Sequence, residues 1–374
     1  MPIVPVPLVT PLEKIATGGS PINVAVQALS TRVGMRIDGT DHSEFDALMV
    51  EWLIEERINQ PARFELLVQN QGPAGLRYDD RRVFEFGKVV EVNSAGGDSL
   101  FKGFVVAISD EFDASTAPRA RLVAADRLER LAATRRSRIF TRVSDKDVIQ
   151  RVASEHGLFA DVNLNTLPVR SSISQFDCSD LDFLRQLAER CNARLRMDDT
   201  RLIAERFDNP DPPAAAFTLG HELQSFSVSA DLRGQPTSVS VGAWSVATGG
   251  PINANATPNP AEFDVPGGDS GAAIRQSAFG SAVFTLASSA AGNAEEATLQ
   301  ARALMATRAR GFVSASGRLG TLAAGVHAGS VVTLAGLGSL HSGRYRITAL
   351  RRRFNPAQGS FTEFEAQRNS IGRP

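Results

Sequence analysis

The sequence has few of the residues that build disulfide scaffolds, metal centres or membrane spans. Its 374 residues include two cysteines, two tryptophans, two tyrosines and five histidines. Two cysteines are too few for a disulfide framework or a four-ligand zinc site, although a single bridge remains open. No run approaches the roughly 20 apolar residues that cross a bilayer as a helix. These absences argue against a small disulfide-rich domain and against a helical membrane protein.

The chain also has almost no excess of charge of either sign. The 40 Lys and Arg residues nearly cancel the 41 Asp and Glu residues, which leaves a formal charge of -1. No overall field would draw such a chain to nucleic acid or to anionic lipid, so partners must be recognised through shape. Hydrophobic residues at 43% and charged residues at 22% are ordinary for globular chains, and this length can hold two or three modest cores.

The first residues carry no basic segment ahead of an apolar one and contain Pro2, Pro5 and Pro7. This pattern does not fit a secretory signal peptide. We therefore expect an extended N-terminal arm over residues 1–30 and folding in the cytoplasm.

The pattern of apolar residues predicts an α+β protein that is mostly β. Period-two alternation and Gly, Asn and Asp turns indicate a first β-barrel domain over residues 31–118. Helical patterns indicate an α+β middle domain over residues 119–210. Strand patterns return in a second β-barrel domain over residues 211–374, with an expected long mobile loop at 249–271 and a helix at 294–310.

Two helix starts in the middle domain follow the same rule. Ser144 with Asp147, and Ser179 with Asp182, have the spacing of N-terminal capping motifs. Gly157 is expected to end the first helix. The second helix places Cys191 on its apolar stripe, which predicts a buried free thiol.

An internal repeat links the two β domains. Residues 87–112 and 329–354 share a Gly start, a Val-rich strand, a Gly-containing turn, a second strand that begins with Gly and a closing Phe. The layout predicts that both domains are versions of one unit. The alternative is that any two hairpins look alike, since Gly and Val match easily.

Motifs for chemistry are weak. Residues 268–271 spell Gly-Asp-Ser-Gly, the string around a protease nucleophile, but no histidine stands in the required setting. The histidines lack metal-binding spacing, and neither GxxxxGK[ST] nor a strand-to-helix GxGxxG is present. We therefore assign no catalytic, cofactor-binding or metal-binding residue and expect a non-enzyme that uses no cofactor. Paired carboxylates of a peptidoglycan hydrolase stay open as an alternative.

Three segments taken in order resemble the phage late control protein D and VgrG hub family. They are Leu-Val-Ala-Ala-Asp-Arg-Leu at 122–128, the acidic helix start at 175–190, and Gly-Arg-Tyr-Arg-Ile-Thr at 343–348 followed by 361–364. Each motif is short, and their order and spacing carry the resemblance over roughly residues 33–368.

The resemblance implies a structural baseplate hub that initiates the tube of a contractile phage tail or tail-like injection system. It implies a homotrimer whose two barrels per chain form a pseudo-sixfold ring between a hexameric inner tube protein and a threefold spike. Few residues follow Phe354, so we expect a separately encoded spike protein, together with other baseplate proteins as partners. A virus, a tailocin, an extracellular injection particle and a type VI system remain open. An unrelated two-barrel binding module is a further alternative.

Overall fold

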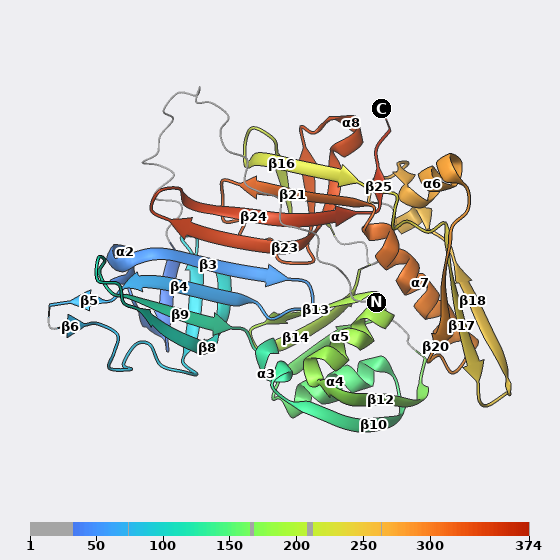
Figure 1. Cartoon of the computed structure of the whole chain (residues 1–374), viewed down its shortest axis with the longest axis horizontal. Coiled ribbons are helices and arrows are strands. Elements are labelled where there is room, and N and C mark those ends of the chain that lie inside the picture. Colours follow the sequence, from blue (N-terminus) through green and yellow to red (C-terminus); the bar gives the residue numbers. More distant parts are fainter. Residues whose placement is uncertain (1–32, 74, 165–167, 208–211, 263, 374) are drawn as a thin grey trace.

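The computed structural model describes residues 33–73, 75–164, 168–207, 212–262 and 264–373. The expected arm at 1–30 lies outside these residues. Strands make up 49% of the chain and helices 19%, so the fold is mostly β, as the sequence predicts. It contains two related β-barrel domains and an α+β middle region (Figure 1).

One sheet of 13 strands runs through both β domains. The first domain contributes β1 (Val33–Ile37), β2 (Thr40–Asp41), β3 (Met49–Arg57), β4 (Arg63–Gln69), β7 (Val89–Ser94), β8 (Ser99–Glu111) and β9 (Arg119–Ala125). The second domain contributes β15 (Ala215–Thr218), β16 (Leu223–Ala230), β21 (Val313–Leu319), β22 (Val331–Ala335), β23 (Gly343–Asn355) and β24 (Gly359–Arg368). Eight of these strands form a stack in the order β16-β21-β24-β23-β3-β4-β9-β8, with β16 at one end and β8 at the other (Figure 1).

Each β domain curls around its own hydrophobic core. The first core includes Phe64, Leu66 and Leu122, and it also takes Leu322 from the second domain. The second core includes Tyr345 and Phe364. Period-two alternation produces these cores, because every other residue of a strand faces the same side.

The two hairpins of the internal repeat have the same backbone pairing. Val89 lies opposite Phe104 in the first, and Val331 lies opposite Arg346 in the second. The Gly87 N–H donates to the Val105 carbonyl at 2.9 Å, and the Gly329 N–H donates to the Ile347 carbonyl at 2.7 Å. Both glycines have positive φ, +81° and +94°, which explains why glycine stands at each position.

The equivalence extends over five strands. A bulge follows Val105 in the pairing of β8 with β9, and one follows Ile347 in the pairing of β23 with β24. A second bulge lies between Met49 and Glu51 where β3 pairs with β4, and its counterpart lies between Leu223 and Ser225 where β16 pairs with β21. Two unrelated hairpins would not share registers and bulges across five strands. The strands β3, β4, β9, β8 and β7 are therefore the counterparts of β16, β21, β24, β23 and β22.

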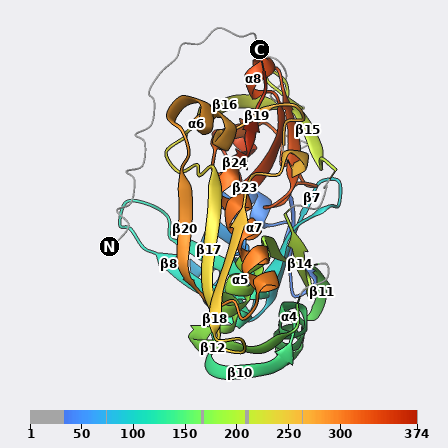
Figure 2. The same ribbon diagram turned by 90° about the vertical axis from the view of Figure 1, so that its right-hand side faces the viewer.

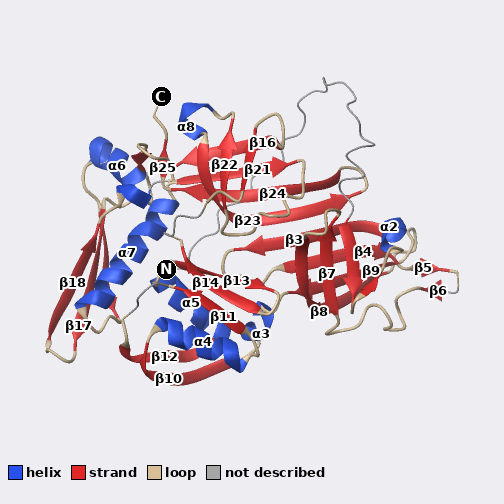
Figure 3. Cartoon of the chain, turned by 180° about the vertical axis from the view of Figure 1, so that it is seen from behind, coloured by secondary structure: helices blue, strands red, loops and turns tan. Residues whose placement is uncertain are grey.

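The middle region packs helices against two small sheets (Figure 3). Its elements are α3 (Leu128–Ala132), β10 (Arg135–Val143), α4 (Asp145–Glu155), β11 (Phe159–Asn163), β12 (Arg170–Ser179), α5 (Asp180–Arg190), β13 (Ala193–Asp198) and β14 (Arg201–Arg206). Both predicted caps are present: Ser144 and Ser179 each accept a hydrogen bond from the backbone N–H three residues later. Gly157 follows α4 with a φ of +68°, and Cys191 is buried and free of a disulfide.

A fourth hydrophobic cluster lies under a separate small sheet beside the second β domain. Its strands β17 (Ser238–Ser245), β18 (Gly250–Ala256) and β20 (Val283–Ser289) run along one side of the molecule with α7 (Ala294–Arg310) packed behind them (Figure 2). The predicted helix at 294–310 has these bounds. Asn293 caps its start and Gly311 ends it.

The prediction of a long mobile loop at 249–271 is wrong for much of its length. Residues 250–256 form β18, in which Ile252, Ala254 and Ala256 are buried while Asn253 and Asn255 are exposed. The alternation is hidden in the sequence because its buried positions are mostly alanine. Pro251 is tolerated because β18 is an edge strand, with β17 as its one partner among the described strands.

The remaining elements are short. They are α2 (Phe45–Leu48), β5 (Gln71–Gly72), β6 (Gly75–Leu76), the 3-10 helix η1 (Pro260–Glu262), β19 (Asp269–Ser270), α6 (Gly271–Phe279), α8 (Gly338–His341) and β25 (Ser370–Ile371). The division into domains stays a prediction, but β9 pairs with β4 and β8, so residues 119–125 belong to the first sheet rather than to the middle domain.

Candidate functional surfaces

Ser270, in the Gly-Asp-Ser-Gly string, is a capping residue. It is buried, precedes α6, and its hydroxyl accepts a hydrogen bond from the Ala273 N–H at 3.2 Å. Asp269 pairs with Arg373 at 2.7 Å. Within the described residues this serine has no histidine among its hydrogen-bond partners, so the string supplies a helix start and no base for a nucleophile.

The histidines lie apart in the fold. His42 contacts Glu44 at 2.7 Å, His156 contacts Asp180 at 2.8 Å and His327 contacts Glu56 at 3.1 Å. These three pairs belong to the first β domain, the middle region and the junction between the two β domains. No group of three or more His, Cys, Asp or Glu side chains that could hold a metal ion occurs in the part of the chain that the structure describes.

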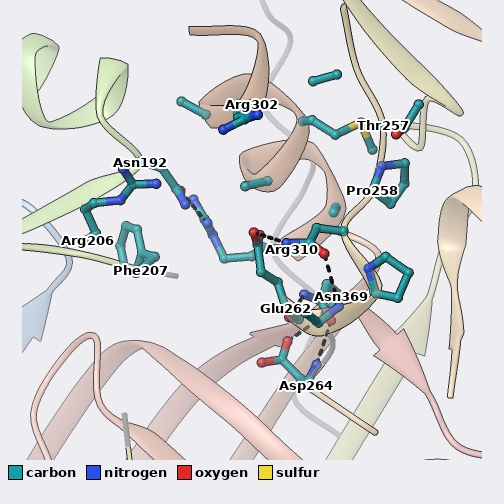
Figure 4. Close-up of a pocket in the computed structure, with 18 of the residues that line it drawn as sticks. Asn192, Arg206, Phe207, Thr257, Pro258, Glu262, Asp264, Arg302, Arg310 and Asn369 are labelled. Atoms are coloured by element: carbon teal, nitrogen blue, oxygen red, sulfur yellow. Dashed lines mark hydrogen bonds between the residues drawn. The ribbon is translucent and has the colours of Figure 1, made fainter. Parts of the chain in front are cut away.

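A cavity of about 630 Å³ lies where the middle region, α7 and the second β domain meet (Figure 4). Arg310 donates to the Asn192 side chain at 2.6 Å and stacks over the Phe207 ring at 4.4 Å. On the opposite wall Asp264 and Asn369 exchange two hydrogen bonds of 2.9 Å. Burial raises the pKa of Asp264, although the Asn369 N–H partly offsets this. These groups bind one another across a seam between chain segments, which is a structural role.

The face of the long sheet that points away from the two cores is polar and charged. Its charged side chains include Glu51, Glu55, Arg57, Arg63, Glu65, Glu111, Arg121, Arg351, Arg353, Glu363 and Glu365. Arg351 lies between Glu55 at 2.9 Å and Glu365 at 3.5 Å. Arg121 lies between Glu65 at 3.4 Å and Glu111 at 3.2 Å. The result is a band of alternating charges that crosses from one β domain to the other.

Beneath this band the two β domains are joined by a buried ion pair. Arg352 is fully buried and donates to Glu56 and to the carbonyl of Leu322 at 2.7 Å. Burial alone would raise the pKa of Glu56, but the charges and hydrogen bonds of Arg352 and His327 outweigh it and lower that pKa to about 2. The pair spans the β23–β3 junction, so a shift in the register of these strands would leave the buried Arg352 without its counter-charge.

Sequence reasoning did not identify the charged band or the junction. Within one strand, the positions Glu51, Leu53, Glu55 and Arg57 alternate with mostly apolar neighbours, and this pattern could have indicated a polar face. Glu55 and Arg57 have partners about 300 positions away, Arg351 and Glu365. Distance along the chain is what concealed the band.

Several solved structures share this architecture. The tail protein of a prophage from Shewanella oneidensis superposes with a TM-score of 0.69, 13% identity and coverage of 91% of this chain and 99% of its own. A tail protein from Neisseria meningitidis gives a TM-score of 0.68, 13% identity, and coverage of 91% and 97%. A component of the Escherichia coli type VI secretion system, structurally similar to phage T4 tail proteins, gives 0.57, 10% identity, and coverage of 91% and 79%. The chain therefore has the fold of phage tail proteins.

Residues 29–355 match the family model described as the Alg8 N-terminal domain, and the chain belongs to that family. No curated protein sequence matches it. In the described ranges, no helix is both long and apolar enough to cross a membrane.

Proposed function

We propose that this protein is a structural baseplate hub of a contractile phage tail or a tail-like injection system. It acts as a homotrimer that adapts a sixfold inner tube to a threefold spike and initiates the tube. Tail proteins and a type VI secretion component share its fold over 91% of the chain, which supports a place in such a machine.

The repeat within the long sheet carries this proposal. Five strands of each β domain share their registers and bulges, so each chain offers two nearly equivalent barrels. Three chains then present six similar positions to a hexameric tube ring and three identical positions to a spike. A symmetry mismatch of this kind needs a repeat inside the chain.

The alternative of a tail-associated enzyme, such as a peptidoglycan hydrolase, has no observation in its favour. The structural neighbours are tail and secretion-machine proteins, and no enzyme family is indicated. Ser270 caps a helix, and the glutamates of the charged band pair with arginines. We place the function in the interfaces.

Native mass spectrometry of the purified chain, alone and after co-expression with its tube and spike proteins, tests the proposal. The expected species is a three-chain complex that binds one ring of tube protein and one spike. A stable two-chain or four-chain assembly in the presence of tube and spike proteins would contradict a threefold hub. Failure to retain either partner would contradict the adapter role.

A further inference from the structure

The stack of eight strands ends in two open strand edges. β16 pairs with β21 on one side, and no described strand pairs with its other side. β8 pairs with β7 as far as Phe104, and Val105 bonds to the two residues before β7, so the second half of β8, from Ala107 onward, has β9 on one side and no described strand on the other. These edges lie at opposite ends of the stack (Figure 1).

The edge of β16 lacks the protection that natural sheet edges usually carry, whereas the second half of β8 carries the charged residues Asp110 and Glu111. The eight residues of β16 include no charge and no proline, and most of them are exposed. Phe112, directly after β8, is 67% exposed. Exposed, uncharged strand edges are places where another strand adds to a sheet. The open, uncharged edge of β16 therefore favours a partner strand.

The chain contains a template for that partner. In the repeat, β8 is the counterpart of β23 and β16 is the counterpart of β3, and inside the chain β23 pairs with β3. Ala349 lies opposite Arg57 and Phe354 lies opposite Trp52 in that antiparallel junction. The two aromatic rings stack, with their centroids 6.5 Å apart and an interplanar angle of 12°.

We propose that residues 107–112 of one copy pair with residues 226–231 of the next copy, in the register of the β23–β3 junction. This proposal rests on the proposed hub. Because β8 corresponds to β23 and β16 corresponds to β3, this register places Ala107 opposite Asp231, Ser109 opposite Ser229 and Phe112 opposite Phe226. The exposed Phe112 ring thereby meets Phe226, as Phe354 meets Trp52 within the chain.

The hydrogen-bonding directions of β16 agree with this register. The Asp231 N–H donates to the Phe312 carbonyl at 2.9 Å, so Asp231 and alternate residues before it face β21. The backbone groups of Phe226, Val228 and Ala230 therefore face the open edge. Their counterparts in β3 are the residues that face β23, because the Ile58 N–H donates to the Thr348 carbonyl at 3.1 Å.

The pairing is head-to-tail, because it joins two different edges of the same chain. Such an interface propagates from copy to copy and closes into a ring when the rotation allows. Since the junction between copies would repeat the junction within each chain, successive barrels around the ring are related in nearly the same way. This is the relation that a sixfold tube requires of its base.

Engineered disulfides test the register. The pairing makes Ser109 and Ser229 a directly opposed pair without mutual hydrogen bonds, the closer kind in an antiparallel ladder. We expect S109C/S229C, in a C178S background, to give interchain disulfides upon mild oxidation and a ladder that ends at three chains. The control S109C/A230C moves one cysteine to the other face of the sheet, and we expect at least tenfold less cross-linking.

A second variant tests the edge without new cysteines. A230P removes a backbone donor that faces the open edge, whereas A230V keeps it. We expect A230P to fold, by circular dichroism, but to lose the trimer that A230V retains. A ladder that ends at two chains or passes three would contradict the trimer and leave the pairing intact. A wild-type trimer that S109C/S229C does not cross-link, or that A230P leaves unchanged, would overturn the pairing and leave the hub intact.

Discussion

Single residues hold the two β domains in one sheet. Arg352 has no exposed surface and forms its ion pair with Glu56, while Arg351 next to it pairs with Glu55 on the half-exposed charged band. Neighbouring arginines in one strand therefore have opposite environments. The buried pair is costly to break, because removing one partner leaves an uncompensated charge.

We predict that E56Q lowers the free energy of unfolding by about 3 kcal/mol because it leaves Arg352 buried without a counter-charge. The matched variant E55Q breaks a half-exposed pair and should cost less than about 1 kcal/mol. Urea denaturation at pH 7 measures both. The contribution of Glu56 should be present above pH 4.5 and disappear as the pH falls towards 2, since its pKa is lowered in the fold. Equal costs for the two variants would contradict a special role for the buried pair.

Asp126 should have the opposite dependence on pH. Burial raises its pKa to about 7, although hydrogen bonds from the N–H groups of Ala62 and Leu128 partly offset this. Between the ordinary pKa of 3.8 and about 7, the folded chain binds a proton that the unfolded chain has released. Stability should therefore fall as the pH rises through this window, by up to about 1.4 kcal/mol per pH unit.

D126N removes this titration, and its stability should change less between pH 5 and pH 7.5 than that of the wild type. Chemical denaturation at the two pH values gives the comparison. A wild-type stability that rises across this interval, or an equal fall in D126N, would show that another group controls the dependence.

At the scale of elements, local patterns predicted helices well and one strand badly. The capping serines Ser144 and Ser179 and the stop at Gly157 act over a few residues, so the sequence alone placed α4 and α5. β18 was missed because its buried positions are occupied by Ile252 and small alanines, and only pairing with β17 makes it a strand. Helix ends are local events, whereas a strand is completed by its neighbours.

The repeated hairpins give a matched pair of substitutions, F354A and F112A. Phe354 stacks on the buried Trp52, so F354A should lower the free energy of unfolding by about 1–2 kcal/mol, less than the loss of a fully buried ring. Phe112 is exposed in the single chain, so F112A should change unfolding by less than about 0.5 kcal/mol. Urea denaturation at a concentration where the chain is monomeric measures both effects.

For trimer assembly, F112A should have the larger effect and F354A the smaller one. F112A removes an aromatic contact proposed between copies and should raise the concentration at which trimers form, measured by sedimentation velocity. F354A lies inside the chain and should leave that concentration nearly unchanged as long as the variant remains folded. A trimer unaffected by F112A would show that the ring lies outside the interface.

For the whole molecule, the junction of β23 with β3 decides how the two barrels relate. It turns two barrels into one stack of strands whose ends, β16 and β8, are left open on opposite sides. The charged band covers the central strands of this stack and does not reach β16, whose residues carry no charge.

The sequence by itself determined the mostly β class, the capped helices, the buried Cys191 and the existence of a repeat. Each depends on neighbours within a turn or a strand, or on similarity between two segments that can be compared directly. Only the tertiary structure decided that the repeat shares its bulges over five strands, that Glu56 meets Arg352, and that β16 and β8 are left as edges. These depend on pairings between strands, some of them hundreds of positions apart. Strand periodicity predicts which face of a sheet a residue lies on, but it does not predict which strand lies beside it.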